Sequence, residues 1–342
     1  MTRICICGGG NLGHVVAGYL AAQGHCEVDL LTRHPERWKG ELLVHTPEGE
    51  TLHGQIHHIS SLPDEVMKDA DIVLLCLPGF SIAEVLHQIA PVLSRHTLVG
   101  SIVSSTGFFE EALQILPEGT PLFGFQRVPF ISRLEEYGCS AHLLGRRSLM
   151  RIGTVNISDT DRLKEQLEFL FHVPVEMLSS YYEASMSNSN PILHPARLYT
   201  MWKEWKPGVV YPRNCAFYGE WTDEASEIYI QMDEELHQLL TVLPVTPHCL
   251  PTVLDYYESH DAASLTHKLR SIEAFQGILS PMKETAEGFV PDLNSRYFTE
   301  DFPYGLDLIR RLAKEKNIHT PVIDLVHRWG QQMIQYGRNE DA

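Results

Sequence analysis

Two short stretches in the second half of the chain gather side chains that could move a proton and hold a carboxylate. The first is Ser187–Pro195, in which His194 stands between an apolar dipeptide and a proline. An imidazole can give and take a proton near neutral pH. The second is Ser295–Gly305, where Arg296 could bind a carboxylate bidentately and one of the two adjacent carboxylates, Glu300 or Asp301, could fix the tautomer of an imidazole. The alternatives are a histidine packed at a domain junction and a surface ion pair.

A third stretch, Cys7–Gly13, reads Cys-Gly-Gly-Gly-Asn-Leu-Gly and contains a complete G-x-G-x-x-G. An apolar run at 3–7 precedes it, and a run of small and apolar residues at 14–23 follows, so a strand, a turn and a helix are expected. The three motif glycines would turn the chain, admit a pyrophosphate and let the helix pack closely. The helix N-terminus would face the phosphates. The pattern predicts a dinucleotide site, against a glycine-rich turn without a ligand. The expected contacts are Gly8, Gly10, Asn11, Leu12 and Gly13.

The end of the second strand bears on which dinucleotide fits. NAD sites usually place Asp or Glu there, where it binds the ribose 2′-OH. Here the strand ends at Thr32 and Arg33, and Asp29 lies inside the run. Arg33 could stack on adenine and pair with a 2′-phosphate, which favours NADP. If the cofactor is NAD, Arg33 would instead be a solvated loop arginine. Further cofactor contacts are expected at Leu77, Pro78 and Thr106, which follow the next two strands.

The first half of the chain alternates strand-like and helix-like segments, which predicts an α/β fold with a mostly parallel, Rossmann-type sheet. From about residue 179 aromatics become dense and long helical patterns replace the alternation. We therefore expect a dinucleotide-binding domain at 1–178 and an all-α substrate domain at 179–342. Ligands of such sheets bind at the carboxyl ends of the strands, so the chemistry is expected in a cleft facing that edge.

Particular elements can be assigned within this plan. Leu42–Thr46 and Gln55–Ile59 flank a Pro-Glu-Gly turn and are expected to form a β-ribbon. Ser81 and Asp159 are each expected to cap a helix. The aromatic residues of the second half are expected to pack its core or an interface between two copies of the chain, so a homodimer is one expected assembly. The alternative is that one or two of them line the substrate pocket. These aromatic residues include Trp202, Trp205, Tyr211 and Trp221.

Bulk composition excludes several classes of partner. The 342 residues carry a formal charge of −17, which argues against nucleic acid and anionic membranes because both require a basic face. The seven cysteines are odd in number and scattered, which argues against a disulfide framework. No signal peptide and no apolar run of membrane-spanning length is visible, so a cytoplasmic location is expected. No carboxylate or cysteine completes a site around His53, His57 and His58, and no metal is expected.

The whole chain resembles the NAD/NADP octopine/nopaline (opine) dehydrogenase family, whose members join a Rossmann domain to an α-helical domain of the 6-phosphogluconate dehydrogenase C-terminal type. The resemblance implies that His194 is the catalytic histidine, Asp301 its carboxylate partner and Arg296 the arginine that holds a substrate carboxylate. Asn190 would orient substrate or nicotinamide. The matching stretches are Gly8–Gly13, Asp69–Pro78, Phe125–Arg133, Asn190–Pro195 and Arg296–Asp301.

That resemblance implies a reaction in which an amino acid and a 2-oxo acid condense and the imine is reduced by NADPH or NADH. The partners would then be small molecules. The runner-up is a reductase of 2-oxo or 3-hydroxy acids that acts on C=O. Many such enzymes use a lysine as proton donor, whereas this chain offers a histidine. The third hypothesis is a non-catalytic NADPH-binding sensor, which would not need His194, Arg296 and Asp301 together.

Overall fold

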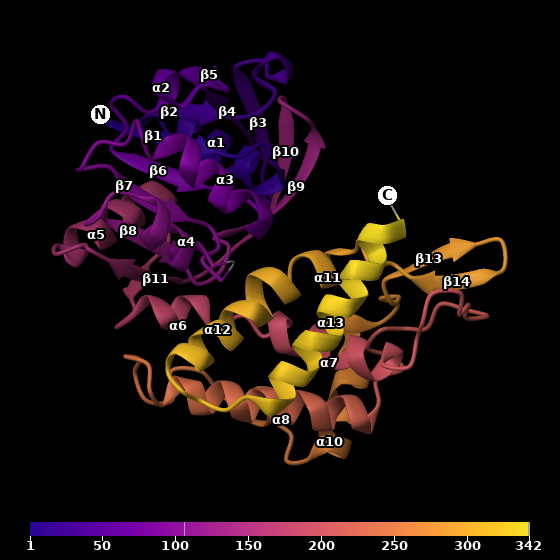
Figure 1. Cartoon of the computed structure of the whole chain (residues 1–342). Coiled ribbons are helices and arrows are strands. Elements are labelled where there is room, and N and C mark those ends of the chain that lie inside the picture. The colour runs from indigo at the N-terminus through magenta and orange to yellow at the C-terminus, as the bar shows by residue number, and fades with distance from the viewer. Residues whose placement is uncertain (106, 341–342) are drawn as a thin grey trace. The chain divides into compact units, whose positions relative to one another are not determined.

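The contacts within the chain divide it into two compact units, Met1–Ser187 (unit 1) and Asn188–Ala342 (unit 2). The structure is a computed structural model that describes residues 1–105 and 107–340. Unit 1 runs from indigo to magenta in Figure 1, and unit 2 continues to yellow.

The division falls after the boundary expected at residue 178, because the next short helix belongs to unit 1. This helix, α6 (Tyr181–Ser185), packs against strands of the unit 1 sheet. Arg127, which follows a strand of that sheet, donates hydrogen bonds to the carbonyl oxygen and the hydroxyl of Ser187 at 2.6 and 3.1 Å. Gln126 donates another to the Glu183 carbonyl at 3.2 Å. These bonds hold the end of unit 1 against its own sheet.

The core of unit 1 is an eight-stranded sheet, counted over the described residues, in the order β12-β11-β8-β7-β6-β1-β2-β5. Its neighbouring strands are parallel except for β8 and β11, so the predicted mostly parallel sheet is confirmed. The strands are Thr2–Cys7 (β1), Cys26–Leu31 (β2), His58–Ser60 (β5), Ile72–Leu75 (β6), Leu98–Ser101 (β7), Leu122–Phe125 (β8), Met150–Val155 (β11) and Val175–Met177 (β12).

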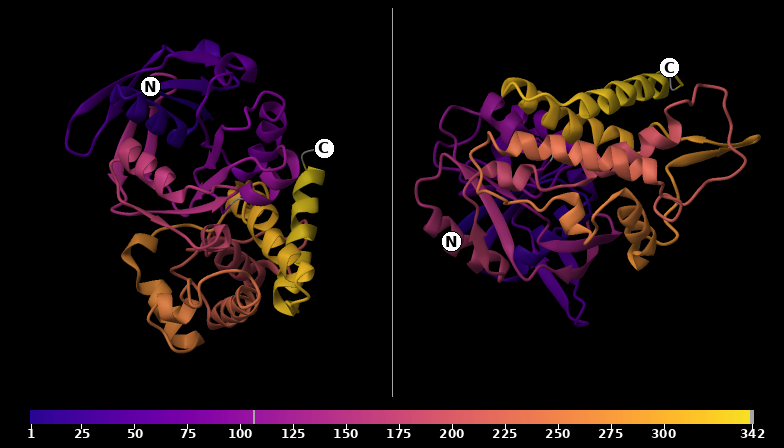
Figure 2. Two further views of the ribbon diagram at one scale, coloured as in Figure 1. Left: turned by 90° about the vertical axis from the view of Figure 1, so that its left-hand side faces the viewer. Right: turned by 90° about the horizontal axis from the view of Figure 1, so that it is seen from below.

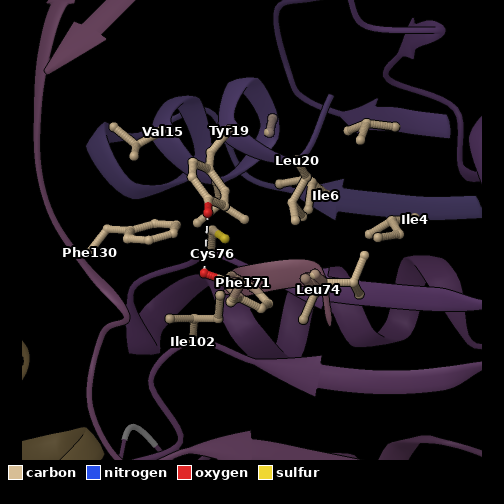
Figure 3. Packing of buried hydrophobic residues seen from close by; sticks show 14 of the residues in the cluster. Ile4, Ile6, Val15, Tyr19, Leu20, Leu74, Cys76, Ile102, Phe130 and Phe171 are labelled. Carbon is tan, nitrogen blue, oxygen red and sulfur yellow. Dashed lines mark hydrogen bonds between the residues drawn. The ribbon is translucent and has the colours of Figure 1, made fainter. Parts of the chain in front are cut away.

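The helices of unit 1 cover this sheet, and their buried faces form its core. In α1 the side chain of Leu20 lies beside Ile6 of β1, as Figure 3 shows, and Val15 belongs to the same buried cluster. The Tyr19 hydroxyl enters the same core and donates a hydrogen bond to the Phe171 carbonyl at 3.2 Å, so this buried hydroxyl is paired. The helices are Asn11–Ala22 (α1), Pro35–Arg37 (η1), Pro63–Val66 (α2), Gly79–Ile89 (α3), Phe108–Ile115 (α4) and Thr160–Phe171 (α5).

A second sheet of unit 1 contains the expected β-ribbon and two strands that the sequence did not indicate. Its order is β4-β3-β10-β9, from Thr51–Gln55, Glu41–His45, Ser140–Arg146 and Phe130–Glu136. The second strand of the ribbon was assigned too late in the chain, because residues 58–60 pair with β2 in the main sheet instead.

Of the two expected helix caps, one is confirmed and one is wrong. The Asp159 carboxylate accepts a hydrogen bond from the Arg162 N–H at 3.0 Å and α5 begins at the next residue. Ser81 does not cap a helix, because α3 starts earlier, after Pro78. Pro78 fixes the extended backbone that precedes the helix, and Ser81 lies in the first turn with its hydroxyl buried.

Unit 2 is helical apart from the short hairpin β13–β14, and its three longest helices lie side by side (Figures 1 and 2). These are α7 (Asn190–Trp202), α8 (Asp223–Leu240) and α13 (Pro321–Glu340). Trp202, Trp205 and Trp221 are buried and pack its core. The other elements are Val253–Tyr256 (α9), Ala262–Ser271 (α10), Glu273–Phe275 (η2), Met282–Thr285 (β13), Gly288–Pro291 (β14), Arg296–Thr299 (α11), Phe302–Leu306 (η3) and Asp307–Glu315 (α12). Among the helices of the described chain, none is both long and apolar enough to cross a membrane.

A histidine–aspartate pair ties α8 to the segment that leads into α9. The Nδ1–H of His237 donates to the Asp233 carbonyl at 2.9 Å and lies 3.4 Å from its carboxylate, while Nε2 faces the Leu250 carbonyl at 3.4 Å. Asp233 also accepts a hydrogen bond from the Val253 N–H at 2.8 Å. The hydrogen bond with the Asp233 side chain raises the pKa of His237 to about 9. The folded unit therefore favours the imidazolium form.

We expect this pair to make the stability of unit 2 depend on pH. Because the folded-state pKa of His237 is raised, its contribution is complete below pH 6.5 and is lost as the pH rises through about 9. The His237→Gln substitution should lower the free energy of unfolding by on the order of 2 kcal/mol at pH 6 and change it little at pH 9.5. Urea unfolding followed by tryptophan fluorescence measures this, because Trp38 is the only tryptophan outside unit 2. The exposed His248 supplies the control, His248→Gln. Equal losses at both pH values would contradict the assignment.

Candidate active site

His194 lies on α7, between a proline at the start of the helix and a proline inside it. Pro191 occupies the first turn, where a missing N–H leaves no helical bond unmade, and Pro195 follows His194 directly. The side chain of His194 is 12 % exposed. The histidine is therefore held on a helix with a restricted backbone, as the sequence predicted, and its side chain keeps limited access to solvent.

Both ring nitrogens of His194 are engaged within unit 2. Nδ1 lies 2.7 Å from the Asp301 carboxylate, and Nε2 lies 3.0 Å from the Tyr218 hydroxyl. A carboxylate can only accept, so the hydrogen-bond network assigns the proton of the neutral ring to Nδ1. Nε2 then accepts a hydrogen bond from the Tyr218 hydroxyl. Nε2 is the nitrogen left to exchange a proton.

Asp301 reaches His194 because a π-turn follows it and packs closely on α7. The turn is η3, and the Leu306 N–H donates to the Asp301 carbonyl at 2.8 Å. A Cβ at Gly305 would collide with the ring of Pro191, so glycine permits this approach. Single π-turns of this kind are frequent at functional sites.

Tyr218 is held by stacking in the loop before α8. Its ring stacks on Phe275 at 4.1 Å between centroids and lies parallel to Trp221 at 6.0 Å. The residue is 5 % exposed. Burial, followed by the nearby Tyr297 hydroxyl, raises the pKa of Tyr218 far above its ordinary value, so the hydroxyl stays protonated.

The loop that carries Tyr218 is fastened to α7 by Arg197, three residues after His194. Its Nε donates to the Phe217 carbonyl at 3.1 Å and its Nη2 donates to the Glu220 carbonyl at 2.7 Å. Burial lowers the pKa of Arg197 to about 10, which still leaves it charged at neutral pH. Arg197 thus fixes the residues on both sides of the tyrosine.

The other two predicted residues lie near this cluster and are exposed. Asn190 is the first residue of α7 and stands one helical turn before His194, on the same face. Arg296 begins α11, and its guanidinium makes no hydrogen bond or ion pair with the residues that the structure describes. The adjacent ring of Tyr297 lies 4.5 Å from that of His194. Tyr218 and Arg197 were missed, because no local motif marks either of them in the sequence.

Unit 1 holds a cavity of about 310 Å³ beside the glycine turn, at the carboxyl ends of β1 and β2. Among the predicted cofactor residues, Gly8, Thr32, Arg33 and Leu77 line it. Ser81 also lines it, and its buried hydroxyl has no hydrogen-bond partner among the described residues. The remaining lining residues are Gly9, Leu31, Ser61, Glu84, Val85 and Gln88.

The remaining predicted cofactor residues surround the start of α1 or lie elsewhere. A Cβ at Gly13 would collide with the Gly8 carbonyl, so the helix packs closely as expected. A Cβ at Gly10 would meet nothing within 4 Å, which leaves open room at the helix N-terminus. Asn11 accepts a hydrogen bond from the Leu134 N–H at 3.1 Å, so its side chain is occupied by β9. Leu12 is half-buried against the core, Pro78 precedes α3, and Thr106 lies outside the described residues.

The cavity and the turn fit a phosphate-bearing nucleotide. The first N–H groups of α1 have no acidic side chain or side-chain cap near them, so they are available to an anion. The unpartnered Ser81 hydroxyl offers a further donor. Within the described residues no group of three His, Cys, Asp or Glu side chains could hold a metal ion.

Comparisons with known proteins agree with both halves of this description. Residues 177–334 match the family model of the NAD/NADP octopine/nopaline dehydrogenase α-helical domain, and residues 4–156 match that of ketopantoate reductase PanE/ApbA. An opine dehydrogenase from Haliotis discus hannai is 26% identical, with 97% of this chain and 90% of the relative covered. A tauropine dehydrogenase from Arabella iricolor is 27% identical, with 98% and 92% covered. A solved octopine dehydrogenase with NADH and L-arginine shares the fold, with a TM-score of 0.85 at 23% identity over 98% of this chain and 90% of that one.

We expect the Arg197→Met variant to loosen the loop that carries Tyr218. Two carbonyl groups would lose their partners in a buried setting, which costs roughly 2–4 kcal/mol of unfolding free energy. The matched control is Arg213→Met on the same loop, because Arg213 pairs with Glu220 at the surface with a side chain 66% exposed. Arg213→Met should lower the free energy of unfolding by less than about 1 kcal/mol. Thermal unfolding compares the two, and equal losses would contradict the role of Arg197.

Proposed function

Because the chain belongs to the NAD/NADP octopine/nopaline dehydrogenase family, we propose that it catalyses the NAD(P)H-dependent reductive condensation of an amino acid with a 2-oxo acid. The product would be a secondary amine that carries two carboxylates, and the reverse reaction would oxidise it. The observation that carries the proposal is the pair His194–Asp301, joined at 2.7 Å on the unit that matches the family model. Its acid–base chemistry is what an imine reduction needs from the protein.

Each predicted catalytic residue has a separate task in this reaction. Asp301 holds the Nδ1 proton of His194 and stabilises the imidazolium, so the ring can release a proton from the opposite nitrogen. Arg296, exposed and without a carboxylate partner among the described residues, would bind the carboxylate of the 2-oxo acid bidentately. Asn190, one turn before His194, would orient the substrate through its amide. The nicotinamide supplies the hydride, and the protein supplies position and protons.

Unit 1 would bind the dinucleotide through the turn and the cavity beside it. The pyrophosphate would lie at the N-terminus of α1, where Gly10 leaves room, and Ser81 would donate to the nucleotide from α3. Thr32 and Arg33 line the cavity at the tip of β2. Asp29, the nearest carboxylate on this strand, is bonded to His57 at 2.8 Å. We therefore propose NADPH as the preferred cofactor.

A second candidate function is the reduction of a 2-oxo acid at its C=O group. The match of residues 4–156 to ketopantoate reductase suggests this candidate, but that unit would bind the cofactor in either case. The histidine of the helical unit favours the imine reaction. We also propose a cytoplasmic location, which fits seven free cysteines in a reducing compartment. The homodimer stays a prediction.

The proposed function is tested by following NADPH and NADH absorbance with 2-oxo acids alone and then with amino acids added. We expect oxidation of the cofactor only when both substrates are present. The His194→Ala variant should lower turnover by about 10² or more and leave cofactor affinity nearly unchanged, because it removes the proton donor from unit 2. His237→Gln serves as the control, since His237 lies outside the site.

Other outcomes distinguish the alternatives. Oxidation with the oxo acid alone would favour the C=O reductase. Tight NADPH binding without turnover across a broad panel would favour the sensor. A His194→Ala variant with near-normal turnover would overturn the assignment of the proton donor.

The cofactor preference is tested at Arg33. We expect the Arg33→Ser variant to raise the KM for NADPH about tenfold or more and to leave the KM for NADH nearly unchanged. A charged hydrogen bond to a phosphate contributes about 1.5–3 kcal/mol, and NADH has no 2′-phosphate to lose. The control is Arg37→Ser, because the Arg37 guanidinium lies over the Tyr137 ring at 4.3 Å. Equal effects on both cofactors would show that Arg33 does not read the 2′-phosphate.

A further inference from the structure

The nitrogen of His194 that must exchange a proton is covered by another side chain. Asp301 occupies Nδ1, and the Tyr218 hydroxyl lies 3.0 Å from Nε2. A substrate that took its proton directly from Nε2 would need the place that the hydroxyl holds. Either Tyr218 moves aside or the proton passes through its oxygen.

The surroundings of Tyr218 oppose its displacement. Its ring is stacked on Phe275 and meets the edge of Phe217 at 4.9 Å between centroids. Both aromatic contacts would be lost if the ring swung away, and so would the stabilisation that they add to burial. Arg197 fixes the backbone at Phe217 and Glu220, on both sides of the tyrosine. The hydroxyl is thus kept on Nε2 by several independent contacts.

We propose that Tyr218 relays the proton between His194 and the substrate, so that the tyrosine hydroxyl is the group that touches the reacting atom. This inference rests on the proposed function and names a catalytic residue that the motifs do not contain. The chain of groups is Asp301, His194 and Tyr218, brought together from α7, the loop before α8 and the segment before η3.

The relay balances without any added reactant. In the direction of condensation, the O–H bond of Tyr218 breaks as its proton passes to the substrate oxygen that leaves as water, or to the substrate nitrogen. The Nε2–H bond of the His194 imidazolium breaks at the same time, and that proton restores the tyrosine hydroxyl. His194 ends as neutral imidazole with its Nδ1 proton still on Asp301. The two transfers are concerted, because burial disfavours a free tyrosinate.

The kinetic test is a double-mutant cycle on Tyr218→Phe and His194→Ala, run with the substrate pair that gives the highest wild-type turnover. The phenylalanine ring keeps the stacking and removes only the hydroxyl. We expect Tyr218→Phe to lower kcat by about 10² or more, with the KM for NADPH unchanged and the double variant no slower than His194→Ala alone. A Tyr218→Phe variant as fast as the wild type, or faster, would overturn the relay. Losses that multiply in the double variant would overturn it too.

The control is Tyr257→Phe, which removes another buried tyrosine hydroxyl of unit 2 and leaves His194 Nε2 with its Tyr218 partner. It should retain the kcat and thermal stability of the wild type. If Tyr257→Phe loses as much kcat as Tyr218→Phe, the effect belongs to the helical core and the relay is overturned.

A measurement independent of turnover tests the contact itself. In protein labelled with ¹⁵N-histidine, the Nε2 resonance of His194 is identified by its absence from His194→Ala. At a pH where the ring is neutral, Tyr218→Phe should move that resonance toward the position of a nitrogen with a free lone pair, and Tyr257→Phe should not. An unmoved resonance would overturn the relay. A wild type that binds NADPH without turning over any substrate pair would instead contradict the proposed function, and the resonance would still decide the contact.

Discussion

The geometry of the helical unit depends on one constraint, which is that a largely buried imidazole must keep partners on both of its nitrogens. An unpaired polar atom in such a place costs about 1–3 kcal/mol. His194 meets the constraint with Asp301 on one side and Tyr218 on the other. Because a carboxylate only accepts, one partner fixes the tautomer and leaves the other nitrogen to exchange protons. The same two contacts therefore give both buried ring nitrogens a hydrogen-bond partner and prepare the ring for acid–base chemistry.

Other features of unit 2 make these two contacts possible. Gly305 lets the turn after Asp301 approach Pro191, and Arg197 holds the loop of Tyr218 through two carbonyl groups. A buried arginine is expensive unless its donors are used, and here the cost is offset by backbone acceptors that would otherwise be unpaired. Hydrogen bonds therefore connect Arg197 to the loop of Tyr218, and Tyr218 in turn to His194.

The sequence predicted those parts of the site that depend on residue type and short spacing. His194 and Asp301 stand 107 residues apart, yet each lies in a dense local motif and the resemblance joined them. Tyr218 has no such motif. Its position depends on stacking against Phe275 and on the hydrogen bonds of Arg197, and neither contact can be recognised from the sequence.

The fold shows the same division between local and distant information. The strands of the parallel sheet were read from apolar runs, and the cap at Asp159 from its position before a helix. Ser81 failed as a cap, because Pro78 had already set the start of α3. The second sheet escaped prediction because β9 is largely exposed and β10, which pairs with β9, joins β3 across a long stretch of chain. Pairing over such separations is decided by packing and not by local pattern.

The two family models that match this chain fall mainly on different units of the fold, one on residues 4–156 and the other on residues 177–334. The dinucleotide unit matches a family of C=O reductases, so its glycine turn and cavity serve hydride donors in general. The helical unit matches the opine enzymes and contributes the histidine, its carboxylate and the exposed arginine. A fold by itself does not set the reaction, which is chosen by the groups placed at the reacting atom. If His194 and Arg296 have the roles proposed for them, the choice between C=N and C=O reduction is made in unit 2.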